Sequence, residues 1–157
     1  MRVPKNRSAR GFSLLELLVV VAIILIITMV ALPSFKEAQR HTREMAAIKA
    51  IQTIHTAQMQ YQSQYGRFAS TLAELGPPLS GRPSASSAAL ISADFAAGKR
   101  TGYCFSLQST EGGYAINASP LSSSSGSRTF YSDETLIIRQ SAAPEPATAA
   151  SPEVSAG

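Results

Sequence analysis

The stretch of sequence that decides the fold is residues 7–33, RSARGFSLLELLVVVAIILIITMVALP. Within it, residues 12–32 are apolar except for Ser13, Glu16 and Thr28. A helix rises about 1.5 Å per residue, so these residues would reach about 30 Å, the thickness of the hydrocarbon core of a bilayer. We therefore predict that residues 12–32 form a transmembrane helix.

A short basic leader, residues 1–11, precedes this helix and contains basic residues but no acidic ones. The positive-inside rule places such an N-terminus in the cytoplasm and the C-terminal domain outside. A secretory signal peptide fits poorly, because the apolar run exceeds the usual ~7–15 residues and Met29-Val30-Ala31 is a poor cleavage site. A plain signal anchor stays open as an alternative.

Glu16 is the feature that a plain anchor does not explain. A charged side chain at the centre of a membrane helix costs roughly 2.5–3.5 kcal/mol on insertion scales, so an acid within a membrane segment is by default functional and has a partner. A local explanation is also open, because Ser13-Leu14-Leu15-Glu16 matches the capping box, in which the glutamate satisfies a free amide at the start of the helix. The two explanations are compatible.

Residues 11–20, GFSLLELLVV, together with Pro33 resemble the processing signature of type IV pilins and of the related pseudopilins of type II secretion. The resemblance implies that a membrane-embedded prepilin peptidase cuts between Gly11 and Phe12 and N-methylates Phe12. It also implies that Glu16 acts in assembly, by recruiting or neutralising the terminal amine of a neighbouring subunit. The protein would then be a single-pass protein of the bacterial inner membrane that later enters a filament.

Residues 33–65 continue the helix with an amphipathic pattern. Apolar residues recur at steps of mainly three or four, at Phe35, Ala38, Met45, Ile48, Ile51, Ile54, Ala57, Tyr61 and Tyr65. Pro33 has no amide hydrogen to donate, so we expect a helix kink or local melting there. A proline one residue after a membrane span can also simply mark its end.

The rest of the chain predicts a small sheet domain. Residues 66–100 read as a connecting loop with a helical turn at residues 71–75 and at most a short helix near residues 88–95. Residues 101–140 predict an antiparallel β-sheet, with Tyr103, Phe105 and Leu107 on one face. Its core would be marginal alone, so we expect the sheet to pack on the long helix. The predicted fold is α+β and type IV pilin-like, followed by a disordered Ala/Ser/Pro tail at residues 141–157.

The remaining candidates for chemistry are weak. We read His41 and His55 as ordinary surface or groove residues, and the charges around Glu44 as helical ion pairs on a solvated face. We expect Cys104 to be packed within a strand. Glu111, Asp133 and Glu134 lack a dense pattern of calcium ligands, so we predict no metal and no cofactor.

These observations favour a structural protein over an enzyme, because the sequence shows no nucleophile with a base and no phosphate-binding loop. The net charge of +4 resides in the leader, so no specific nucleic acid is expected as a partner. The leading hypothesis is a type IV pilus subunit whose partners are prepilin peptidase, the assembly machinery, the inner membrane and further copies of itself. One alternative is a pseudopilin of a type II secretion system, and another is a membrane-anchored binding domain that does not polymerise.

Overall fold

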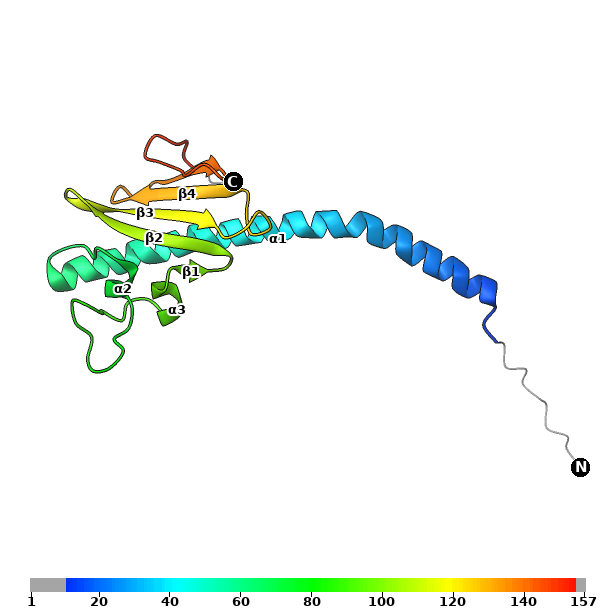
Figure 1. The fold of residues 1–157 in the computed structure, drawn as a ribbon, viewed down its shortest axis with the longest axis horizontal. Helices are drawn as coiled ribbons and strands as arrows, with labels where there is room; N and C mark the ends of the chain where they lie inside the picture. Colours follow the sequence, from blue (N-terminus) through cyan, green and yellow to red (C-terminus); the bar gives the residue numbers. More distant parts are fainter. Residues whose placement is uncertain (1–10, 155–157) are drawn as a thin grey trace, which may run out of the picture. The chain divides into compact units, whose positions relative to one another are not determined.

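The computed structural model describes residues 11–154, apart from the side chains of residues 30–34. Along the chain the elements are α1 (Leu14–Tyr65), α2 (Leu72–Leu75), α3 (Ala93–Ala96), β1 (Lys99–Arg100), β2 (Tyr103–Thr110), β3 (Gly113–Pro120), β4 (Arg128–Asp133) and β5 (Ile138–Ala142). The five strands form one antiparallel sheet in the order β1-β2-β3-β4-β5, and the later part of α1 packs on it (Figure 1). The predicted α+β class, a long N-terminal helix packed on an antiparallel sheet, is confirmed.

The chain forms two compact units, with the boundary between Glu37 and Ala38. The first unit contains the start of α1, where the large apolar side chains from Phe12 to Met29 are 44–82% exposed. A search of the described helices found none that combines the length and the apolarity needed to span a bilayer. Helix α1 does not end at Pro33, because its backbone is helical on both sides of the proline.

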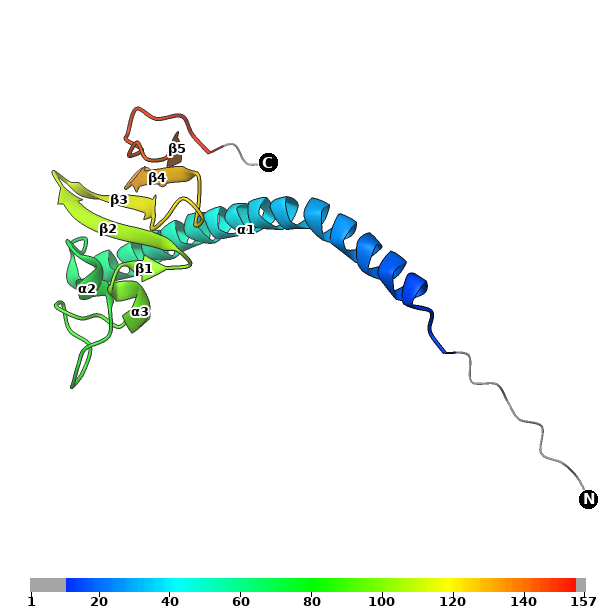
Figure 2. The same cartoon turned by 45° about the vertical axis from the view of Figure 1, so that its right-hand side comes forward.

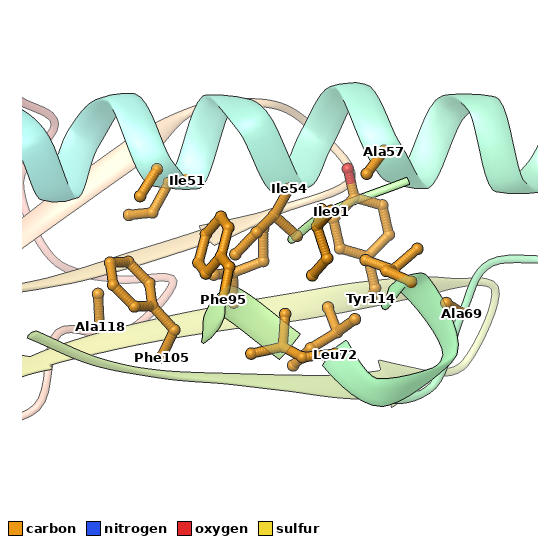
Figure 3. Close-up of a cluster of buried hydrophobic side chains, with 14 of the residues drawn as sticks. Ile51, Ile54, Ala57, Ala69, Leu72, Ile91, Phe95, Phe105, Tyr114 and Ala118 are labelled. Carbon is orange, nitrogen blue, oxygen red and sulfur yellow. The ribbon is translucent and has the colours of Figure 1, made fainter. Parts of the chain in front are cut away.

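The second unit holds the hydrophobic core. Its helix contributes one face, on which most buried positions are three or four residues apart: Ala47, Ala50, Ile51, Ile54, Ala57 and Tyr61. Figure 3 shows side chains of α1 facing those of the sheet, with Ile51, Ile54 and Ala57 on one side and Phe105, Tyr114 and Ala118 on the other. The predicted stripe is therefore correct in its second half. Phe35 and Ala38 are exposed, since the buried positions of α1 begin only at Glu44.

The strands follow the predicted alternation. Tyr103, Phe105 and Leu107 of β2 are buried, whereas the residues between them are exposed. A turn at Glu111 and Gly112 joins β2 to β3, and Gly112 has a φ of +89°, which a glycine adopts without strain. Figure 2 shows β1 and β5 at the two edges of the sheet.

The connecting segment contains the predicted turn of helix at α2, whose N-cap is Thr71. The helix expected near residues 88–95 is shorter than predicted, at Ala93–Ala96. Residues 88–91 are instead irregular, with Ala89 at a φ of +56°, and Ala88 N donates to Glu74 O at 2.8 Å and Leu90 N donates to Leu75 O at 2.8 Å. The reason is that the carbonyl groups at the end of α2 lack donors within that short helix.

The expectation of a disordered tail is wrong for residues 141–154. Strand β5 runs to Ala142, and the returning chain pairs with it: Gln140 N donates to Pro152 O at 2.9 Å and Val154 N donates to Ile138 O at 2.8 Å. The amino-acid composition of the tail does not predict this pairing, because backbone hydrogen bonds along a sheet edge do not depend on apolar side chains.

Candidate functional site

The predicted processing site lies immediately before α1. The helix begins at Leu14, so Gly11 and Phe12 belong to non-helical chain. Phe12 is 80% exposed, and a Cβ placed on Gly11 would have no heavy atom within 4 Å. Within the described part of the chain, both residues of the predicted bond are therefore exposed.

Glu16 lies in the first turn of α1 and is exposed. Leu17 N donates to Ser13 O at 3.1 Å, which makes Ser13 the residue that caps the helix. Between residues 11 and 154, no hydrogen bond joins the Ser13 side chain to the Glu16 amide or the Glu16 carboxylate to the Ser13 amide, so the capping box is not formed there. The carboxylate still lies in the first turn, at the positive end of the helix dipole.

The surface around Glu16 is apolar on every side of the helix. Successive residues of an α-helix turn by about 100°, and large apolar residues occupy almost every position from Leu14 to Met29. All of them are exposed. A helix that is apolar all round requires apolar surroundings, either lipid or other protein chains.

Sequence reasoning missed the role of Glu44. We expected a solvated ion pair, but Glu44 is 4% exposed and its carboxylate joins α1 to the sheet domain. It accepts hydrogen bonds from Ser127 N at 2.8 Å and Ser127 Oγ at 2.9 Å, and from Arg128 Nε at 2.8 Å. Burial raises the pKa of this carboxyl, but the hydrogen bonds from Ser127 and Arg128 outweigh it, and the pKa lies below its usual value. The spacing along the helix could have indicated that Glu44 is buried, because Glu44 falls three residues before Ala47 on the buried stripe.

His55 is also buried, against the expectation of a surface or groove residue. Its Nδ1 lies 2.7 Å from Tyr114 Oη and its Nε2 lies 2.8 Å from Ser132 Oγ. Since Ser132 Oγ donates to Ile137 O, it accepts from Nε2–H, and in the neutral ring Nδ1 then accepts from Tyr114 Oη. Both ring nitrogens are thus paired. Burial lowers the pKa of His55, with the charge of Asp133 acting in the opposite direction.

Two further expectations concern the sheet. Cys104 is exposed rather than packed, because the alternation of β2 turns it away from the face that packs on α1. The Asp133 carboxylate has a partner close by in the sequence, since it accepts a hydrogen bond from Thr135 N at 3.0 Å. Among the residues that the structure describes, no group of three His, Cys, Asp or Glu is placed to hold a metal ion.

Comparison with known proteins bears on the N-terminal segment. A family model described as the prokaryotic N-terminal methylation motif matches residues 6–32, which contain Gly11, Phe12 and Glu16. Comparisons with curated proteins and with solved structures each found no match. Residues 6–10 of the matched segment lie outside the described part of the structure. The chain therefore carries the N-terminal methylation signature of type IV pilins and pseudopilins.

Proposed function

We propose that this chain is a structural, non-enzymatic subunit of a type IV pilus. In this proposal it is made as a prepilin in the bacterial inner membrane, processed between Gly11 and Phe12, and assembled into a helical filament through α1. The observation that carries the proposal is Glu16, the single charged residue between Arg10 and Lys36, which lies within the methylation motif at the start of an exposed apolar helix.

Processing by prepilin peptidase would change the charge at the start of the helix. Cleavage after Gly11 removes the basic leader and creates a new terminal amine on Phe12, which the enzyme then methylates. The exposed, non-helical position of both residues supports this step. The mature chain would begin two residues before α1, with a cation at its end and Glu16 in the first helical turn.

Assembly would bring that amine to the Glu16 carboxylate of a neighbouring copy. Each charge alone is costly in apolar surroundings, but a paired amine and carboxylate compensate each other. A pair of this kind forms at one axial offset only, in the way that buried polar groups fix the register of coiled coils. Glu16 would thus set the register of the filament.

The membrane would hold the subunit before assembly. The apolar side chains around α1 from Leu14 to Met29 need lipid until other copies replace it. Pro33 then serves as the position where the helix kinks or melts as it leaves lipid for the filament, because one helical hydrogen bond is missing there.

An assembly assay with Glu16→Ala tests this proposal. We expect cleavage to continue and filament yield to fall by roughly tenfold or more, because the terminal amine loses its partner. Glu37→Ala is the matched control, since Glu37 is an exposed glutamate of the same helix. Normal filaments from Glu16→Ala would contradict the register role.

Imaging of the cell surface distinguishes the two kinds of filament. Long filaments outside the cell agree with a type IV pilus. A short filament confined to the cell envelope, together with a defect in protein secretion when the chain is removed, would instead assign it to the pseudopilins of type II secretion.

A further inference from the structure

The unit formed by residues 38–157 carries opposite charges at the two ends of its sheet. Because Thr110 pairs with Gly113 and Ala115 pairs with Asp133, one end of the sheet holds the acidic residues Glu111, Asp133 and Glu134. We call this the acidic end. Glu111 and Glu134 are exposed there.

The opposite end of the sheet is basic. Arg100 pairs with Tyr103, which pairs with Pro120, so β1 lies at this end together with the start of β4. Here the strands approach the first turns of α1 in this unit, where Arg43 donates to Ser124 O at 2.9 Å and Glu44 binds Arg128. We call this the basic end.

A groove of about 460 Å³ opens at the basic end. Arg40 of α1 lines it on one side, and small or hydroxyl-bearing residues of the sheet domain, among them Ser122, Gly126 and Thr129, line the other. Within the described part of the chain, Arg40 is its one charged lining residue and forms no ion pair. The groove therefore offers a guanidinium and several hydroxyl groups, which suit a carboxylate on a slender segment.

The β2–β3 turn at the acidic end is a slender segment that carries a carboxylate. It consists of Glu111 and Gly112 followed by Gly113, with the exposed Glu134 side chain against Gly113, so its tip presents carboxylates and little side-chain bulk of its own. A Cβ placed on Gly112 would meet nothing within 4 Å, so there is open space beside this residue of the turn.

The turn cannot reach the groove of its own chain. The eight residues of β3 separate the two ends of the sheet by about 26 Å at 3.3 Å per residue. A contact between this turn and this groove can therefore form only between two copies. A contact between two different surfaces of identical chains is head-to-tail, and such contacts build open helical filaments unless the rotation closes a ring.

We propose that the Glu111–Gly113 turn of one copy docks into the Arg40 groove of the next copy along the filament. This rests on the proposed function, because it needs copies stacked in one direction. The Glu111 carboxylate pairs with the Arg40 guanidinium, and the glycines let the turn enter between α1 and the loop before β4.

Charge reversal tests the docking. Arg40→Glu and Glu111→Arg alone should each lower filament yield roughly tenfold or more, since each places like charges together. The double variant Arg40→Glu/Glu111→Arg restores opposite charges and should recover most of the yield. Arg82→Glu is the matched control, because Arg82 is an exposed arginine outside the groove.

Cross-linking gives a second readout that does not depend on yield. In a Cys104→Ser background, the pair Arg40→Cys and Glu111→Cys should form disulfide-linked ladders of copies in filaments, and Arg82→Cys with Glu111→Cys should not. Filaments of normal yield from both single charge reversals, without ladders, would overturn the docking. A failure of the proposed function is distinguishable, because the unsubstituted chain would then form no filaments.

Discussion

The Glu44 carboxylate of α1 accepts a hydrogen bond from Arg128 Nε at 2.8 Å and lies 2.6 Å from Arg128 Nη2, so that one buried acid ties the long helix to the start of β4. Ser127 adds two further hydrogen bonds to the same carboxylate. The sheet domain contains few large apolar residues in its loop before β4, and this ion pair fixes that loop on the helix. Glu44 thus holds the sheet domain on the helix, a role that the charged residues around it in the sequence do not indicate.

Replacing Glu44 should destabilise the protein strongly. Glu44→Ala leaves Arg128 and the Ser127 amide without their acceptor, and breaking a buried pair of this kind costs about 3 kcal/mol. Denaturant unfolding of the full chain in detergent, followed through the sheet domain, measures the change. Glu37→Ala, at an exposed position of α1, should change stability by less than about 0.5 kcal/mol. Equal effects of the two substitutions would contradict the structural role of Glu44.

Acid should destabilise the sheet domain in two separate steps. The folded pKa of His55 lies below its ordinary value of 6.5, so the unfolded chain binds a proton at a higher pH than the folded chain does. The stabilisation is therefore complete above about pH 6.5 and decreases as the pH falls below it. The depressed pKa of Glu44 adds a second loss, below about pH 4.5, as the pH falls through its folded pKa.

The step that belongs to His55 can be isolated by substitution. His55→Asn should be less stable overall, because it breaks the contacts with Tyr114 and Ser132, but its stability should not change between about pH 7 and pH 5.5. His41→Asn, at an exposed position, should keep the pH dependence of the original chain. If His55→Asn retains that dependence, another group is responsible for it.

Gln58 should be another sensitive position of α1. Its side-chain amide is fully buried, donates to Ala69 O at 2.9 Å and accepts from Ala69 N at 2.8 Å, which fixes the chain just after the helix. Gln58→Leu would leave both backbone groups of Ala69 buried without partners, at a cost of about 2 kcal/mol. Gln60→Leu, on the exposed side of the helix, is the control. Thermal unfolding that ranks the two variants in the reverse order would refute this assignment.

The C-terminal segment should protect the edge of the sheet. Truncation after Ala150 removes Pro152, whose carbonyl accepts from the Gln140 amide. Hydrogen exchange at Gln140 should become at least about tenfold faster, because the edge of β5 then faces solvent. The amides of β2 serve as an internal reference and should keep their exchange rates. Unchanged exchange at Gln140 would show that the pairing does not protect this edge.

Much of the fold could be predicted from local patterns. The alternation in β2 and the spacing of Ile51, Ile54 and Ala57 directly encode which side chains face the core. Contacts between distant segments could not be predicted in this way. Glu44 and His55 look like ordinary surface residues until Ser127, Tyr114 and Ser132 are brought to them from far along the chain.

The tail and Cys104 show two other limits. Residues 141–154 have the composition of a disordered segment, yet a free strand edge gives their backbone partners. A prediction from composition considers only how much apolar surface the side chains can bury, and it does not consider backbone pairing. For Cys104, the general tendency of cysteine to be buried competed with the alternation of β2, and the alternation determined the outcome.

The N-terminal mass of the protein isolated from the cell envelope and from any filaments that it forms tests the central claim most directly. We predict that the chain begins at Phe12 and carries one methyl group on its terminal amine, because the partner of Glu16 exists only after the bond to Gly11 is cut. A chain that retains residues 1–11 would contradict both filament hypotheses and would favour an anchored domain that does not polymerise.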